Sequence, residues 1–218
     1  MSTVVTTTGT EAPGFDFGLA FKGGWRLFVK DLGVLIIGTI VATVLSVLTI
    51  GILAGPLMGG LYGMVVGRVR DGKTPHVGDV FDQFDRFWSF FGAFWILAIL
   101  IGLASITVVG GILLAAIWLY VFPVMVDRRM GFGDAMGESY RIVKGAFWET
   151  VALVIIGVVI GSVANGLLML LATPFLVALI VAAYYVAAGR GAEVERACGP
   201  RRGPRGRRAP PPGRSGRS

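Results

Sequence analysis

The sequence predicts an all-α integral membrane protein with six transmembrane helices, arranged as three hairpins that each follow an amphipathic interfacial helix. The composition is the first observation, since 55% of the 218 residues are hydrophobic and 15% are charged, whereas a soluble domain has about 25% charged residues. The second is that three uncharged runs cover residues 32–67, 87–126 and 150–189. The third is that charged residues gather at the ends of these runs.

Each uncharged run is too long for one membrane helix and long enough for two. As a single helix, the shortest run would measure about 54 Å, but the hydrocarbon core of a bilayer is only about 30 Å thick. Each run also has glycine or proline near its middle, and Thr173 is a candidate N-cap for a helix that starts at Pro174. We therefore predict spans at about 32–50, 54–70, 87–108, 112–129, 149–168 and 174–190. The alternative is that some second halves re-enter the membrane without crossing it.

The interfacial helices are predicted from residues that recur every three or four positions. In the first, an aromatic face lies opposite a basic face. The aromatic residues are Phe17, Phe21, Trp25 and Phe28, and the basic residues are Lys22, Arg26 and Lys30. A break at Gly23-Gly24 is possible. Similar patterns start near residues 77 and 134, which indicates a unit repeated about every 60 residues over 15–70, 77–129 and 134–190.

Glycine returns at every fourth position in one part of the first run. These residues are Gly51, Gly55, Gly59, Gly63 and Gly67. Five glycines are costly in a water-soluble helix, but small residues at this spacing let membrane helices approach closely. We interpret the row as a glycine zipper whose partner lies in the span 32–50, with the span 149–168 as the alternative.

Charge placement predicts the topology. Before residue 190, every basic residue lies near the start or end of a run and none lies at a mid-run break. The positive-inside rule then places both termini in the cytoplasm. Residues 1–14 and 191–218 are predicted to be disordered tails. Nine arginines, counted from Arg190, give the second tail a basic character that suits anionic lipid headgroups or RNA, although a merely solvated tail is an equal alternative.

Candidate catalytic and metal sites are few. Asp79, Asp82 and Asp85 are three residues apart, which suits either a magnesium site or a solvated helix face, and we favour the solvated face. His76 and Cys198 are the only histidine and cysteine, which excludes an internal disulfide and the usual zinc clusters. Because the interiors of the spans hold no ionisable side chain, we expect no proton- or ion-coupled transport. We predict no catalytic residue, cofactor or metal.

Residues 120–148 carry a resemblance to a known group. Pro123 lies four residues before Asp127, and a glycine turn then leads to Ala135, Ser139 and Gly145. This pattern resembles prokaryotic multi-pass membrane proteins of unknown function, including the membrane domain fused to some glycerophosphodiester phosphodiesterases. The resemblance covers about residues 15–190 and implies a helical membrane domain in the plasma membrane of a prokaryote. We see no hydrolase domain in the sequence and therefore carry over no phosphodiesterase activity.

Together these observations predict a non-catalytic membrane domain that binds lipids or partner proteins, including other copies of itself. A transporter or lipid flippase for an apolar substrate is the first alternative. A lipid-modifying enzyme, which would need His76 or the three aspartates, is the second.

Overall fold

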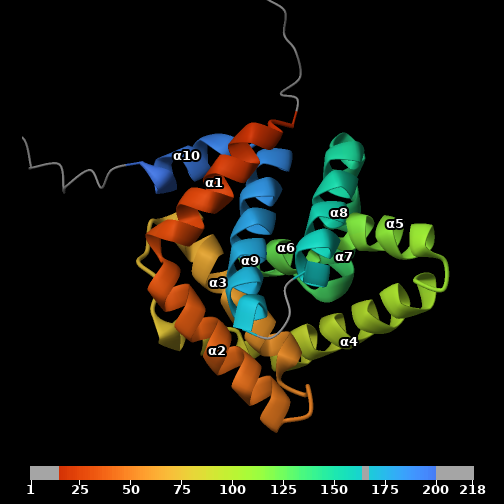
Figure 1. Ribbon diagram of the computed structural model, residues 1–218, viewed down its shortest axis with the longest axis horizontal. Coiled ribbons are helices and arrows are strands. Elements are labelled where there is room, and N and C mark those ends of the chain that lie inside the picture. The colour runs from red at the N-terminus through yellow and green to blue at the C-terminus, as the bar shows by residue number, and fades with distance from the viewer. Residues whose placement is uncertain (1–14, 164–166, 200–218) are drawn as a thin grey trace, which may run out of the picture.

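The computed structural model describes residues 15–163 and 167–199, and within these ranges every regular element is a helix (Figure 1). The helices are α1 (Phe17–Lys30), α2 (Leu32–Leu48), α3 (Ala54–Asp71), α4 (Phe87–Ala104), α5 (Val108–Trp118), α6 (Val121–Asp127), α7 (Phe132–Gly145), α8 (Phe147–Val163), α9 (Leu167–Ala187) and α10 (Gly191–Cys198). Two 3-10 turns, η1 (Val77–Phe81) and η2 (Phe84–Arg86), precede α4. The all-helical prediction is confirmed for the described residues.

Among residues 15–163 and 167–199, three to five segments are long and apolar enough to cross a membrane. Three qualify alone, namely Val77–Ala104, Val109–Asp127 and Leu168–Ala187. Two more qualify only as bent pairs, α1 with α2 at 83° and α7 with α8 at 106°. Helix α3 is not among them, because its glycines add little hydropathy and its last turn carries Arg68 and Arg70. The count of six spans and their hairpin pairing therefore stay predictions.

Helix α3 lies inside the molecule, where it packs against α2, α4, α6 and α9. Its glycines set how closely two neighbours approach. A Cβ atom at Gly55 would overlap the carbonyl oxygen of Phe90 in α4, and one at Gly59 would lie 2.6 Å from the Phe90 ring. A Cβ atom at Gly60 would overlap the carbonyl oxygen of Val80 in η1. The closest approaches to the glycines of α3 therefore come from α4 and η1, and not from α2 or α8 as the sequence pattern predicts.

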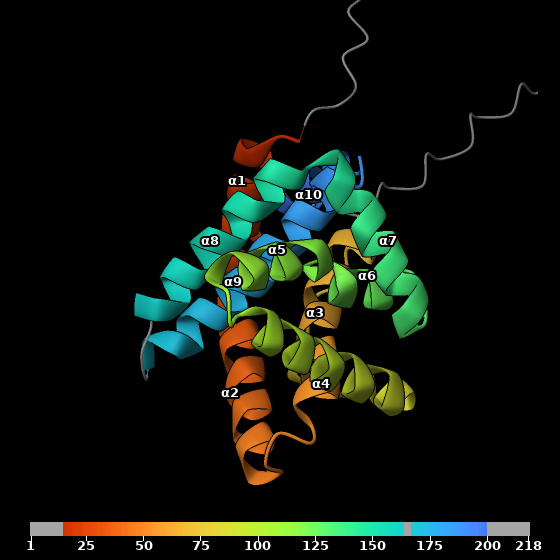
Figure 2. The ribbon, with the colours of Figure 1, turned by 90° about the vertical axis from the view of Figure 1, so that its right-hand side faces the viewer.

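Figure 2 shows the hairpin of α4 and α5 in front of α3, with α2 and α9 to the left of α3. The α4–α5 hairpin extends away from α1, α2 and α10 (Figure 1). In the segment Val77–Ala104, which contains α4, only 17% of the most apolar stretch is buried inside the protein. The corresponding value for Leu168–Ala187 in α9 is 56%. Large side chains such as Ile99, Leu103 and Ile106 are exposed along this hairpin. Such a surface is expected for a helix that faces lipid.

Two local predictions are wrong at helix boundaries. The segment before the second run forms η1 and η2 and not one amphipathic α-helix. Helix α9 runs unbroken from Leu167 through Pro174, and the Thr173 hydroxyl donates to the Met169 carbonyl at 2.9 Å, so Thr173 is not an N-cap. Membrane helices tolerate an internal proline because neighbouring helices and Ser or Thr side chains can satisfy the backbone groups that it frees.

Helix α1 forms over the residues predicted for the first amphipathic helix, and the possible break at Gly23-Gly24 does not occur. One further prediction is corrected by packing. Residues Gly191–Cys198 form α10 and are not disordered, because Val194 is fully buried against the rest of the protein. The first tail, residues 1–14, and residues 200–218 of the second lie outside the described residues.

Candidate functional site

Helix α1 is positioned by its two glycines. A Cβ atom at Gly24 would lie 2.8 Å from Cα of Leu179 in α9, and one at Gly23 would lie 2.5 Å from Cγ1 of Val194 in α10. Both distances are closer than real side chains tolerate, so the glycines let α9 and α10 approach α1 directly. The start of α1 is fixed by Asp16, whose carboxylate accepts from the Leu19 amide at 2.9 Å. The glycines thus serve packing and do not break the helix.

An apolar groove lies between α1, α8 and α9. Its volume is about 510 Å³, and its lining includes Trp25, Phe28, Val159, Ile160, Leu171 and Phe175. The Phe175 ring meets the rings of Trp25 and Phe28 edge-on, with centroids 5.9 and 5.7 Å apart. Trp25 is 53% exposed at the edge of the groove. Because every side chain in the lining is apolar, the groove suits a hydrocarbon chain and no polar solute.

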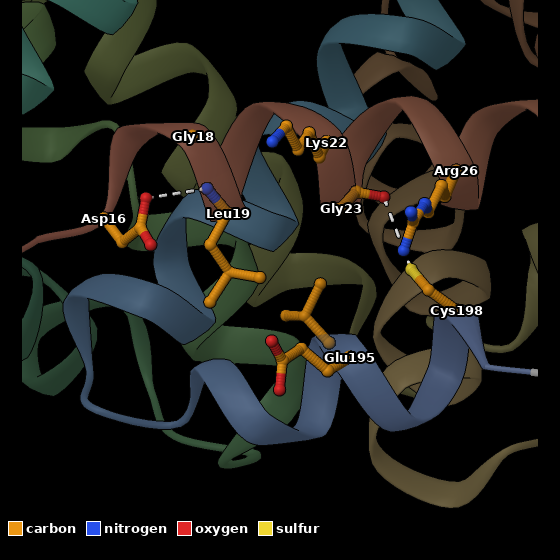
Figure 3. Close-up of a pocket in the computed structure, with 9 residues that line it drawn as sticks. Asp16, Gly18, Leu19, Lys22, Gly23, Arg26, Glu195 and Cys198 are labelled. Carbon is orange, nitrogen blue, oxygen red and sulfur yellow. Dashed lines mark hydrogen bonds between the residues drawn. The ribbon is translucent and has the colours of Figure 1, made fainter.

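A polar pocket lies on the other flank of α1, against α10 (Figure 3). Lys22 and Arg26 approach it from α1, whereas Glu195 and Cys198 approach it from α10. Its volume is about 270 Å³. Burial raises the pKa of the Cys198 thiol, and the positive charges of Arg26 and two other basic residues oppose that shift. The thiol lies 3.7 Å from the Gly23 carbonyl, so it is a packing contact of α10.

The most polar interior cluster surrounds Asp127, the last residue of α6. Its carboxylate accepts from the Tyr184 and Tyr185 hydroxyls of α9 at 2.9 Å each, and from Arg190 at 2.5 Å. The Asp127 side chain is 2% exposed. Arg190 also pairs with Glu193 of α10 at 2.8 Å, and its guanidinium lies 4.5 Å from the centroid of the Tyr185 ring. This cluster joins α6 to the α9–α10 junction.

Electrostatics at this junction favour the charged form of Arg190. Hydrogen bonds to Glu193 and Asp127 raise the pKa of Arg190 above its usual range, although partial burial acts in the opposite direction. The Arg70 guanidinium of α3 donates to the Asp127 carbonyl at 2.9 Å. The buried Asp127 carboxylate thus accepts from three donors, one of which is the Arg190 cation, so hydrogen bonds compensate for its burial. We therefore assign the cluster a structural role, that of fixing α10.

A second polar attachment holds the other end of α10. The Lys30 ammonium at the end of α1 donates to the carbonyls of Ala197 and Gly199 at 2.9 and 3.2 Å. These carbonyls lie at the C-terminal end of α10, where a cation is favourable. Nearby, Arg68 of α3 pairs with Asp31 at 3.1 Å, and both side chains are at most 10% exposed. Helix α10 is thus held at both ends.

The predicted motif residues come together only in part. Pro123 and Asp127 are buried in α6, and Ala135 and Ser139 are buried in α7. The Ser139 hydroxyl donates at 2.9 Å to the Ile117 carbonyl, near the break between α5 and α6. Gly145 ends α7, before the bend into α8, and a Cβ atom there would meet nothing within 4 Å. Sequence reasoning singled out Asp127 but missed its partners, although a tyrosine pair in an aliphatic run was a visible signal.

The other candidate residues lie elsewhere. The Asp79 carboxylate accepts from the His76 amide at 2.9 Å and pairs with Lys73 at 3.2 Å, which explains it as a cap of η1. Asp82 lies 3.9 Å from Lys73. Within residues 15–163 and 167–199, no group of three or more acidic, histidine or cysteine side chains has metal-binding geometry.

The five glycines of the predicted zipper divide into three groups. Gly55 and Gly59 lie in the tight contact with Phe90, whereas Gly51 has a φ of +81° in the turn before α3. Gly63 and Gly67 line a polar pocket of about 380 Å³, which Gln83, Arg70 and Arg129 also line. A Cβ atom at Gly67 would meet nothing within 4 Å. Close approach therefore explains only part of the row.

Comparison with protein-family models, curated proteins and solved structures finds no match to this chain. The resemblance at residues 120–148 stays a prediction.

Proposed function

We propose that this chain is a multi-pass integral membrane protein that binds lipid without catalysing a reaction. The observation that carries the proposal is the aromatic-lined groove between α1, α8 and α9. Its purely apolar lining matches an acyl chain. The 83° bend from α1 into α2 supports the geometry, since α1 lies along the membrane surface if α2 crosses the bilayer.

The membrane in this proposal is the plasma membrane of a prokaryote, with both termini cytoplasmic. Support comes from the basic residues, because Lys30 ends α1, Arg68 and Arg70 lie in the last turn of α3, and Arg190 lies just before α10. The arginines that follow α10 in the sequence add contacts to anionic headgroups at about 1 kcal/mol per residue near the surface. Native mass spectrometry of the purified protein measures whether other copies of the chain join at the exposed α4–α5 hairpin.

Lipid binding is tested with a phospholipid that carries a photoreactive group on its acyl chain. In nanodiscs, mass spectrometry should locate cross-links on Trp25, Phe28 or Phe175. Ala172→Phe should fill the groove and lower this labelling several-fold, because Ala172 lines it. Ile106→Phe on the exposed α4–α5 hairpin is the matched control. Labelling spread evenly over all apolar helices would contradict the proposal.

Topology is tested with single cysteines in a Cys198→Ser background. Cysteines at positions 53 and 110 should react with an impermeant maleimide from outside the cell. Those at positions 75 and 132 should react only after the membrane is permeabilised. The opposite labelling pattern would overturn the proposed orientation.

A further inference from the structure

The polar pocket between α1 and α10 holds two cations that have no internal partner. In the part of the chain that the structure describes, neither Lys22 nor Arg26 makes a hydrogen bond or ion pair. They are four residues apart and approach the same pocket (Figure 3). Lys30, the third basic residue of α1, is already bonded to the end of α10. Two neighbouring unpaired cations favour a phosphate as their ligand.

One carboxylate is also free in this pocket. Glu195 of α10 makes no ion pair within the described residues and approaches from the wall opposite Lys22 and Arg26. Asp16, the other carboxylate of the lining, is bonded to the Leu19 amide at the start of α1. The available charges are thus two positive and one negative. A ligand that complements them carries a phosphate and an ammonium group.

The pocket and the apolar groove lie on either side of the same stretch of α1. Trp25 lines the groove, and its sequence neighbours at 22 and 26 line the pocket. A helix with side chains is about 10–12 Å across, so one phospholipid reaches both flanks. Trp25 itself is exposed between them, and tryptophan prefers the boundary of headgroup and acyl chain.

We propose that the pocket between α1 and α10 binds the headgroup of an aminophospholipid whose acyl chain lies in the groove of Phe175. Lys22 and Arg26 bind the phosphate, and Glu195 accepts from the primary ammonium. Helix α10 is fixed by Lys30 and by the Asp127 cluster, so Glu195 is held in place before the lipid arrives. This assignment rests on the proposed lipid binding in the groove and adds its headgroup specificity.

The test uses three photoreactive lipids with identical chains and ethanolamine, glycerol or choline headgroups, in nanodiscs of phosphatidylcholine. We expect the ethanolamine lipid to label Trp25 and Phe175 several-fold more than the other two. Lys22→Gln with Arg26→Gln should lower its labelling to the choline level. Glu195→Gln should remove the preference for ethanolamine over glycerol, since only the ammonium contact is lost. Arg141→Gln, which removes an exposed cation on α7, is the control.

The outcomes separate the two proposals. Equal labelling of the groove by all three lipids overturns the headgroup assignment and leaves lipid binding intact. Preference for the glycerol lipid in the parent protein also overturns it, because the site then selects negative charge alone. Absence of groove labelling by any lipid overturns both proposals. Since Lys22, Arg26 and Glu195 are exposed and make no internal ion pair, unchanged thermal unfolding is expected for all three substitutions.

Discussion

Removal of the Asp127 carboxylate should destabilise the protein strongly. Asp127→Ala leaves the hydroxyls of Tyr184 and Tyr185 and the guanidinium of Arg190 without their acceptor. Each hydrogen bond to a charged group contributes about 1.5–3 kcal/mol. Because the contributions of neighbouring hydrogen bonds do not add, we expect Asp127→Ala to lower the free energy of unfolding by about 3–5 kcal/mol, the cost of breaking a buried ion pair. Arg190→Gln should also destabilise the protein, by about 3–5 kcal/mol, because it leaves the Asp127 carboxylate, whose side chain is 2% exposed, without its cation.

The assay is unfolding of the purified protein in detergent micelles, followed by circular dichroism against denaturant. We expect a lower midpoint with an unchanged slope for Asp127→Ala. Asp134→Asn is the control, since Asp134 is an exposed carboxylate on α7. In the double variant of Asp127 and Arg190, the effect of the second substitution should largely vanish. If the free energy of unfolding of Asp127→Ala lies within about 0.5 kcal/mol of that of the parent protein, the cluster does not fix α10.

Three further outcomes are expected. Gly60→Ala should destabilise the protein, because its Cβ would overlap a carbonyl oxygen. Gly67→Ala has open space around it and should be neutral or stabilising by up to about 1 kcal/mol. Equal thermal unfolding temperatures for the two variants would refute this. A chain that ends at Gly199 should unfold like the parent but bind anionic vesicles less well at low salt, as measured by co-sedimentation. A chain that ends at Gly189 should also unfold at a lower temperature, because it lacks α10. The rate at which iodoacetamide alkylates the Cys198 thiol should rise with pH with a midpoint above the ordinary thiol pKa of about 8.5, because burial disfavours the thiolate. A midpoint below that value would contradict the geometry.

The sequence predicted the helices well where local chemistry decides them. Helices α2 and α3 cover the residues predicted as the first two spans, because long apolar runs interrupted by glycine and proline admit few alternatives to helices. As membrane spans they stay predictions, since α2 qualifies only together with α1 and α3 does not qualify. The sequence failed where an element is stabilised only by distant contacts. Residues 191–198 look like part of a disordered tail, yet Val194 is buried. Lys30 also binds the end of α10 through the carbonyl of Ala197, which is 167 positions away in the chain.

The candidate sites show the same division. Asp127 attracted attention through a local motif, but its partners Tyr184, Tyr185 and Arg190 are 57–63 positions distant, which no pattern within one segment reveals. For Asp79, Asp82 and Asp85, the spacing in the sequence left a magnesium site and a solvated helix face as alternatives, and we favoured the solvated face. That Asp79 instead caps η1 depends on backbone geometry that spacing does not show.

By itself, the sequence determined that most of this chain forms long apolar helices, which are compatible with a membrane protein. It also predicted that charged residues lie near the helix ends, because charge is costly inside a bilayer. Only the tertiary structure decided which neighbours approach the glycines of α3, that α10 is part of the fold, and that an apolar groove and a polar pocket flank α1. These features depend on contacts between helices far apart in the chain, and the periodicity of one helix gives its face but not the helix that covers it.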